Sequence, residues 1–245
     1  MTVIRSYERF AHKGANFRIA CDRLDAVTRQ IVAQRSLLDR YIARHAEFGR
    51  SMAPVAALPD APEVARHMAR AAAAVGVGPM AAVAGAMAQL AVEAAIDAGA
   101  DEAVVENGGD MFLACRAEAV VGLYPGPGPL AEALALAVQP DDTPLAICSS
   151  SGTMGHSLSL GRCDLATVVS RDAALADAAA TLAANLVNTA DDIDPALERI
   201  AAIPGVDGAL LVKGDRIGLI GRLPRLVRNH DVELTVKVTR DPQSE

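Results

Sequence analysis

Residues 71–92 form an uncharged stretch, and this stretch constrains the fold more than any other part of the sequence. It is long enough to cross a bilayer as a helix. However, alanine, glycine and valine make up most of it, and Gly76, Gly78, Pro79 and Gly85 interrupt it. Because alanine is nearly neutral for membrane insertion, this composition favours a buried helical segment of a globular protein over a membrane span. We therefore expect no membrane association.

The overall composition also supports a globular chain. Hydrophobic residues make up 51% of the sequence, aromatic residues make up only 3%, and tryptophan is absent. So many apolar residues argue against disorder, whereas so few aromatic residues argue against a single-strand nucleic-acid binder with stacking platforms. The formal net charge is −7, and acidic residues dominate the middle of the chain. An acidic middle disfavours nucleic-acid binding in general, and it can hold a divalent cation.

Cysteine usage and the N-terminal sequence favour the cytoplasm. The cysteines Cys21, Cys115, Cys148 and Cys163 form no CxxC pair and no cluster with histidine. This spacing disfavours a structural zinc site and fits reduced thiols better than a disulfide scaffold. The opening MTVIRSYERF lacks the apolar core of a signal peptide, so we expect a cytoplasmic protein.

In the first part of the chain, polar and apolar residues alternate, and a helical pattern of apolar residues follows. Residues 4–12 and 16–22 are expected to form a strand pair joined by a turn. Apolar residues at three- and four-residue steps predict a helix from Leu24 to about Phe48, with Asp22 as its cap. The arginines of this helix fall mostly on its other faces, which predicts a solvated surface.

A proline-rich connection at 51–62 follows, which would divide a single domain of residues 1–245 into two lobes. Beyond it, helices and strands mix without strict alternation, which predicts an α+β or mixed α/β fold. Ser170 is the expected cap of one helix, and Pro195 is the expected first residue of another. The expected elements are helices over 62–75, 80–98, 171–188 and from 194, strands over 102–107, 111–115, 119–124, 145–150, 163–170 and 232–238, and a hairpin over 208–221.

The sequence Asn107-Gly108-Gly109-Asp110 follows one of these strands. Paired glycines allow positive φ angles, which can turn backbone N–H groups toward a ligand. Asn-Gly is equally the favoured pair of a type I′ hairpin turn, so a purely structural turn stays open. As a functional element, Asn107, Gly108 and Gly109 would bind a ligand.

A second loop, SSSGTMGHS at 149–157, is rich in hydroxyl groups. Such a loop can cradle a phosphate through backbone N–H and hydroxyl donors, although it lacks the spacing of a P-loop. His156 is the acid–base candidate, and a Ser/His nucleophile pair or an ordinary polar loop remain alternatives. The candidate binding residues are Ser150, Ser151, Gly152 and Thr153.

Asp177 and Thr181 stand four residues apart in an alanine-rich segment, so on a helix they share one face. A carboxylate on an otherwise apolar face needs a partner if it is buried. A carboxylate and a hydroxyl form a partial ligand set for Mg²⁺, which often takes further oxygens from water and phosphate. The alternative is that Asp177 faces solvent.

These features occur in an order that resembles the ApbE superfamily, the FAD:protein FMN transferases. The sequence motifs are most similar to those of a compact branch of that superfamily, and the function of this branch is unknown. The resemblance covers nearly the whole chain. It implies a duplicated sheet-and-helix fold that binds a flavin nucleotide, FAD or FMN, with Mg²⁺. The matching segments are GPMAAVAGAMA (78–88), VENGGDMF (105–112), SSSGTMGHS (149–157) and ALADAAATLAAN (174–185).

The resemblance also implies roles for individual residues. Asp177 and Thr181 match the family's metal-binding carboxylate and hydroxyl, and a backbone carbonyl near Ala82 would be the third protein ligand. The glycine pair and the loop at 150–156 would lie along the nucleotide.

The chain differs from the family at several places, among them the missing Asp-Leu-Gly-Gly lead-in, and the differences leave several functions open. Ala84 replaces the family's lysine, and His156 is only a weak counterpart of the family's His-Ile-Ile-Asp-Pro segment, where Asp110 could offer a carboxylate. One function is an Mg²⁺-dependent enzyme that transfers a phosphoryl or FMN group to a protein acceptor, with His156 or Asp110 as acid–base. Another is a binding or accessory protein of cytosolic sulfur or cofactor metabolism. A serine hydrolase using Ser150 or Ser151 is a third, without an oxyanion motif. Each is compatible with a homo-oligomer.

Overall fold

An antiparallel sheet organises the molecule. The computed structural model describes residues 5–127, 130, 134–152 and 161–229. Within these residues, a large sheet of eight strands has the order β1-β2-β3-β4-β7-β8-β9-β10, and all neighbours are antiparallel. Its strands are β1 (Glu8–His12), β2 (Ala15–Cys21), β3 (Ala103–Asn107), β4 (Asp110–Ala114), β7 (Leu145–Ser150), β8 (Leu165–Ser170), β9 (Val206–Lys213) and β10 (Arg216–Gly221).

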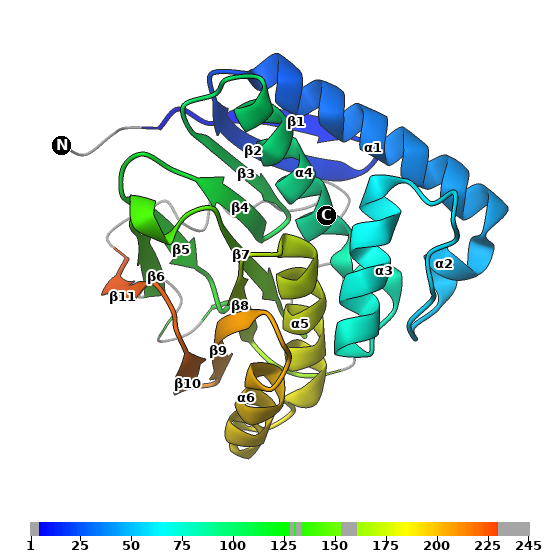
Figure 1. The fold of residues 1–245 in the computed structure, drawn as a ribbon. Coiled ribbons are helices and arrows are strands. Elements are labelled where there is room, and N and C mark those ends of the chain that lie inside the picture. Colours follow the sequence, from blue (N-terminus) through cyan, green and yellow to red (C-terminus); the bar gives the residue numbers. More distant parts are fainter. Residues whose placement is uncertain (1–4, 128–129, 131–133, 153–160, 230–245) are drawn as a thin grey trace.

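A smaller sheet lies on one side of the large sheet, and the helices lie on the other (Figure 1). The small sheet has the strand order β11-β6-β5. Its strands are β5 (Ala119–Leu123), β6 (Leu134–Val138) and β11 (Arg225–Arg228). The helical elements are α1 (Leu24–Arg44), α2 (Ala46–Arg50), α3 (Glu63–Val75), η1 (Pro79–Ala82), α4 (Val83–Asp97), η2 (Pro140–Asp142), α5 (Ala173–Leu186), η3 (Ala190–Asp192) and α6 (Ile193–Ala201).

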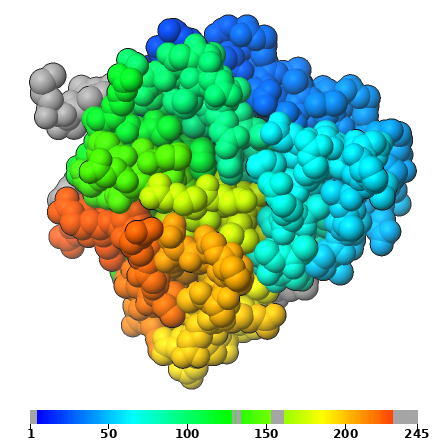
Figure 2. Space-filling model, viewed as in Figure 1, coloured from blue at the N-terminus to red at the C-terminus, as the bar shows by residue number. Residues whose placement is uncertain are grey.

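Strand alternation divides the apolar residues of the large sheet between two cores. On β3, Val105 faces the helices, and its neighbour Val104 faces the small sheet. The helix-side core includes residues from both α1 and α3, which precede and follow the connection at 51–62. The surfaces of α1 (blue) and α3 (cyan) adjoin in the space-filling view (Figure 2). The layered fold is therefore mixed α/β, as the sequence predicts.

The uncharged stretch that suggested a membrane span folds as the end of α3, η1 and most of α4. The helical segment Pro79–Asp97 is long and apolar enough to cross a membrane by length and composition, but 61% of its apolar window is buried inside the protein. It packs against α1, α5 and the large sheet. This burial is typical of a core helix, because its apolar side chains already have protein partners.

Three predicted helix ends are wrong. Arg23, not Asp22, is the N-cap of α1, and no side chain caps it. The N-cap of α5 is Asp172, whose Oδ1 accepts a hydrogen bond from Leu175 N at 3.1 Å. Ser170 instead ends β8, and its hydroxyl donates to Gly205 O at 2.8 Å. Pro195 is the third residue of α6, because η3 leads into that helix.

The predicted long helix also ends early, since α1 stops at Arg44 and α2 follows. Strands β6 and β11 have no counterpart in the prediction. The predicted strand over 232–238 lies outside the described residues.

The four thiols differ in accessibility, which gives a first testable prediction. Cys115, Cys148 and Cys163 are buried, and Cys21 is partly exposed. Burial raises the pKa of the Cys115 and Cys163 thiols to about 11, and raises the pKa of the Cys148 thiol well above its usual range. Because the thiolate is the reactive form, we expect a disulfide reagent at pH 8 to label at most Cys21 rapidly. All four should react after denaturation, and rapid labelling of two or more in the native protein would contradict the described packing.

Tyr41 connects α1 to the segment that leads into α3. Its ring is buried, and its hydroxyl accepts a hydrogen bond from Leu58 N at 3.1 Å. We expect Tyr41→Phe to lower the free energy of unfolding by about 1 kcal/mol, because it removes this bond without leaving a cavity. Urea denaturation measures the change, and an unaltered unfolding midpoint would show that water satisfies the Leu58 N–H equally well.

Candidate functional site

A large open cavity lies at the tip of the β3–β4 hairpin. Its volume is about 1870 Å³, which exceeds the roughly 300–1,000 Å³ of ordinary small-molecule sites. Residues from the start of α4, the end of β7 and the middle of α5 contribute to its wall. The predicted site residues that line it are Asn107, Gly108, Gly109, Asp110, Ser150, Ser151, Asp177 and Thr181. The fold thus brings most of the predicted residues together around one large cavity.

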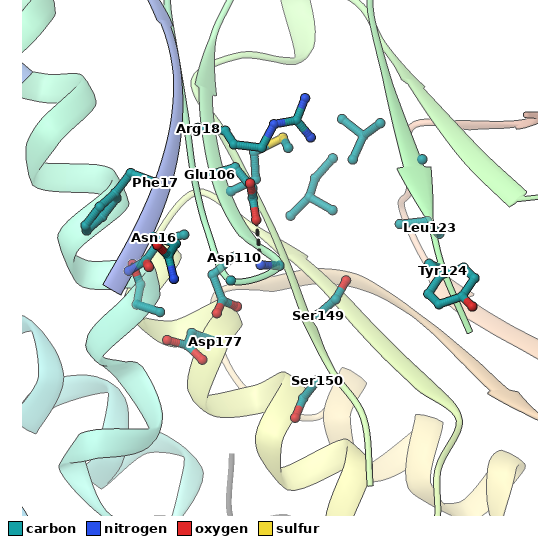
Figure 3. Close-up of a pocket in the computed structure, with 18 of the residues that line it drawn as sticks. Asn16, Phe17, Arg18, Glu106, Asp110, Leu123, Tyr124, Ser149, Ser150 and Asp177 are labelled. Atoms are coloured by element: carbon teal, nitrogen blue, oxygen red, sulfur yellow. Dashed lines mark hydrogen bonds between the residues drawn. The ribbon is translucent and has the colours of Figure 1, made fainter. Parts of the chain in front are cut away.

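The Gly108–Gly109 pair makes a tight two-residue turn between β3 and β4. Asn107 and Asp110 are register partners, and the glycines have φ angles of 66° and 103°. Positive φ at both positions is the signature of a type I′ turn, which confirms the structural interpretation without removing the turn from the cavity wall. The Glu106 carboxylate accepts a hydrogen bond from Gly109 N at 2.9 Å (Figure 3) and fixes the turn.

Asp177 is buried where α5 meets the start of α4. Its Oδ2 accepts a hydrogen bond from Gly85 N at 2.9 Å. A further hydrogen bond, from the backbone of Ala84, also favours its ionised form, but burial raises the pKa of Asp177 to about 7. An anion at a helix N-terminus is stabilised by the free N–H groups there. Asp177 therefore does not face bulk solvent, and it joins α5 to α4.

Asp110 faces Asp177 across this corner of the cavity. Figure 3 shows the two carboxylates pointing toward one another. Burial raises the pKa of Asp110 well above its usual range, and the negative charge of Asp177 raises it further. The Oδ1 atom of Asp110 is buried and has no hydrogen-bond partner. Among the described residues neither carboxylate has a cationic ion-pair partner, and two such buried carboxylates are costly, so this corner is suited to receive a proton or a cation.

The remaining predicted residues divide into three groups. Ser150 and Ser151 are buried at the end of β7 and line the cavity. Gly152 is not among the residues that line the cavity, and its N–H donates to Cys163 O at 2.8 Å. Ala82 is fully buried, and its neighbours Ala81 and Val83 line the cavity. Thr153 and His156 lie outside the described residues.

Sequence reasoning missed the basic and aromatic part of the cavity. Arg18 lies on the face of β2 opposite to Phe17, and its guanidinium stands 5.0 Å from the centre of the Tyr7 ring. Arg35 of α1, expected on a solvated face, lines the cavity and donates to Asp39 at 2.8 Å. The one signal for Arg18 in the sequence is its position between two apolar residues of a strand, which indicates the opposite face.

A protein-family model matches most of the chain. The family model described as "AbpE bacteria" matches residues 8–215. A UPF0280 protein from Methanocella arvoryzae is 44% identical over 196 residues, which cover 80% of both chains. A UPF0280 protein from Methanosarcina acetivorans is 38% identical over 225 residues, with 90% of this chain and 88% of the relative covered.

Solved structures share the fold at low sequence identity. The apo form of the flavinyl transferase ApbE from Pseudomonas stutzeri superposes with a TM-score of 0.59 at 13% identity, covering 90% of this chain and 96% of its own. The ApbE protein from Thermotoga maritima gives a TM-score of 0.54 at 12% identity, covering 97% and 100%. These likenesses support the duplicated sheet-and-helix fold that the resemblance implies.

Proposed function

The chain belongs to the AbpE bacteria family of the ApbE-like superfamily, and from this premise we propose that it binds a flavin nucleotide, FAD or FMN, with Mg²⁺. The observation that carries the proposal is the buried carboxylate corner formed by Asp110 and Asp177. It opens onto a cavity of dinucleotide size beside a glycine turn. A pyrophosphate nucleotide with a divalent cation matches this combination of charge and space.

The residues present fit a hard divalent cation. Asp177 and Thr181 line the same cavity from neighbouring turns of α5, and the buried Oδ1 of Asp110 lacks a hydrogen-bond partner. Carboxylate and hydroxyl oxygens are the donors that Mg²⁺ prefers. Asp177, Thr181 and the carbonyl of Ala82 would hold the ion, which when bound would neutralise charge on the pyrophosphate.

The chain's own residues would orient the nucleotide. The Gly108–Gly109 turn and the residues Ser150 and Ser151 line the cavity from two strand ends, and the Ser151 hydroxyl also donates to Cys163 O at 3.5 Å. Backbone N–H groups and hydroxyls are suitable donors to phosphate oxygens. Positioning and electrostatics are the main contributions that a protein makes to phosphoryl transfer.

If the protein is a transferase, FMN would pass to a protein acceptor. The pyrophosphate bond of FAD would break, a bond would form between the FMN phosphorus and an acceptor hydroxyl, and AMP would leave. The hydroxyl proton would pass to a base, for which His156 and Asp110 are the two candidates.

One observation favours binding without transfer. Ala84 lines the cavity at the position where the superfamily carries a lysine, and its carbonyl accepts a hydrogen bond from Asn107 Nδ2 at 3.4 Å. A methyl group cannot supply the positive charge that an ammonium group would bring to a phosphate. The alternative function is therefore a nucleotide-binding or accessory protein of cytosolic cofactor metabolism.

Flavin binding and transfer can be tested separately. We expect FAD to bind in the presence of Mg²⁺ and to be released by a chelator, as followed by flavin fluorescence and by the absorbance and mass spectra of the purified protein. Absence of flavin binding at millimolar Mg²⁺ would refute the proposal. Mass spectrometry of an added acceptor protein then decides between the two functions, because only a transferase adds FMN to a threonine or serine.

A further inference from the structure

The carboxylate corner holds more negative charge than the metal set of Asp177, Thr181 and Ala82 accounts for. Asp110 and Asp177 are only 7% and 8% exposed. Asp177 accepts a hydrogen bond from Gly85 N at the start of α4. Beside Asp110, the Cys148 thiol donates to Ala173 O at 3.5 Å and Ser149 N donates to Gly109 O at 3.2 Å. The Oδ1 atom of Asp110 has no hydrogen-bond partner. A buried, unpartnered carboxylate oxygen that faces a second buried carboxylate indicates a missing positive group.

The described residues do not supply that positive group. Two of the arginines at the cavity wall pair elsewhere: Arg5 with Glu102 at 3.0 Å and Arg35 with Asp39 at 2.8 Å. Among the residues that the structure covers, no lysine or arginine forms an ion pair with Asp110 or Asp177. A neutral methyl group at Ala84 stands at the wall instead.

We infer that Asp110 is a second carboxylate ligand of the cation, opposite Asp177, so that this chain holds a divalent metal before any nucleotide arrives. The inference rests on the proposed function and deepens it. Affinity for hard cations rises with the number of charged oxygen ligands, and two facing carboxylates supply two. Asp110 is then occupied by the cation and does not serve as the base, so the proton of the acceptor must go elsewhere.

The β3–β4 turn explains why Asp110 is held in place for this role. Its register partner across the turn is Asn107, which donates to Ala84 O at the start of α4. Asp177 accepts from Gly85, the next residue of the same helix. The two carboxylates are thus fixed against one helix terminus, and a ligand pair that is already ordered loses little entropy when it binds a metal.

Binding of Mn²⁺ alone tests the inference, because Mn²⁺ accepts the same oxygen ligands as Mg²⁺ and is paramagnetic. We expect the nucleotide-free protein to bind Mn²⁺ in titrations followed by electron paramagnetic resonance. Asp110→Asn should weaken this binding at least about tenfold. The matched control is Glu106→Gln, which removes a carboxylate from the same hairpin but keeps its hydrogen-bond acceptor for Gly109 N; it should change the affinity by no more than about threefold.

Thermal unfolding gives an independent readout of the same variants. Without metal, Asp110→Asn should melt at a higher temperature than the parent protein, because it relieves repulsion between buried carboxylates. Added Mn²⁺ should then raise the melting temperature of the parent more than that of the variant. A variant that has merely misfolded would melt lower in both conditions.

The outcomes separate this inference from the proposed function. Parent-like Mn²⁺ affinity in Asp110→Asn, with loss in Asp177→Asn, would overturn the inference and leave the proposed metal site standing. If the parent protein binds Mn²⁺ only in the presence of FAD, the inference is likewise overturned and the proposed metal site stands. No Mn²⁺ binding to the parent protein, with or without FAD, would overturn both.

Discussion

Replacing Asp177 with alanine is expected to lower the Mg²⁺-dependent affinity for FAD at least about 100-fold. The side chain would supply a charged metal ligand, and its Oδ2 also accepts the Gly85 N–H at the start of α4. Fluorescence titration of FAD with the variant, at fixed Mg²⁺ and after chelation, measures the loss. The affinity for FAD that is measured after chelation should change little, since Asp177 would act on FAD binding through the metal.

A second variant separates the charge from the helix contact. Asp177→Asn keeps an oxygen acceptor for the Gly85 N–H but removes the carboxylate charge, so it should lose Mg²⁺-dependent binding while folding normally. Asp97→Asn, at the exposed end of α4, serves as the control for a change in total charge and should bind as the parent does. Parent-like FAD binding in Asp177→Asn would contradict the role of Asp177 as a metal ligand.

Gly85→Ala is expected to destabilise the fold by about 3 kcal/mol or more. A Cβ atom at this position would lie 2.1 Å from the carbonyl oxygen of Ala173 and 2.9 Å from Cβ of Asp177. Rigid backbone at the start of α5 cannot retreat as a flexible side chain would, so the two helices must separate. Urea denaturation followed by circular dichroism measures the loss.

Gly99→Ala is the matched control for that substitution. Gly99 has a positive φ of 85°, but a Cβ atom there would meet no heavy atom within 4 Å. We expect it to cost only about 1 kcal/mol of backbone strain. Equal losses in the two variants would show that the α4–α5 contact is looser than described.

Local sequence patterns predicted the parts of the site that depend on local geometry. Asp177 and Thr181 share a helix face because their spacing matches one turn, and the turn at Gly108 follows from the Asn-Gly pair. Sequence spacing could not predict that Asp110 and Asp177 face each other, because this arrangement depends on the long-range packing of α5 against β4. The resemblance to a known family assigned Asp177 to the metal, whereas Asp110 was a candidate only as a substitute for a family segment that this chain lacks.

The failures of the secondary-structure prediction have local causes. Ser170 fits the composition of a helix cap as well as Asp172 does, and only the hydrogen bond to Leu175 N distinguishes them. Strand β6 is buried along its whole length, so it shows no alternation of polar and apolar residues. Strand β5 alternates in exposure, since Val120 is exposed and Val121 is buried, but both residues are apolar.

The sheet order has a consequence for folding. Strand β2 ends at Cys21, and its partner β3 begins only at Ala103, so their pairing closes a long segment of chain that contains α1, α3 and α4. Such long-range closure is entropically costly and slow. The β3–β4 turn, the start of α4 and α5 also meet only through long-range contacts. Metal binding during refolding should therefore report these long-range contacts, whereas helix content should recover earlier.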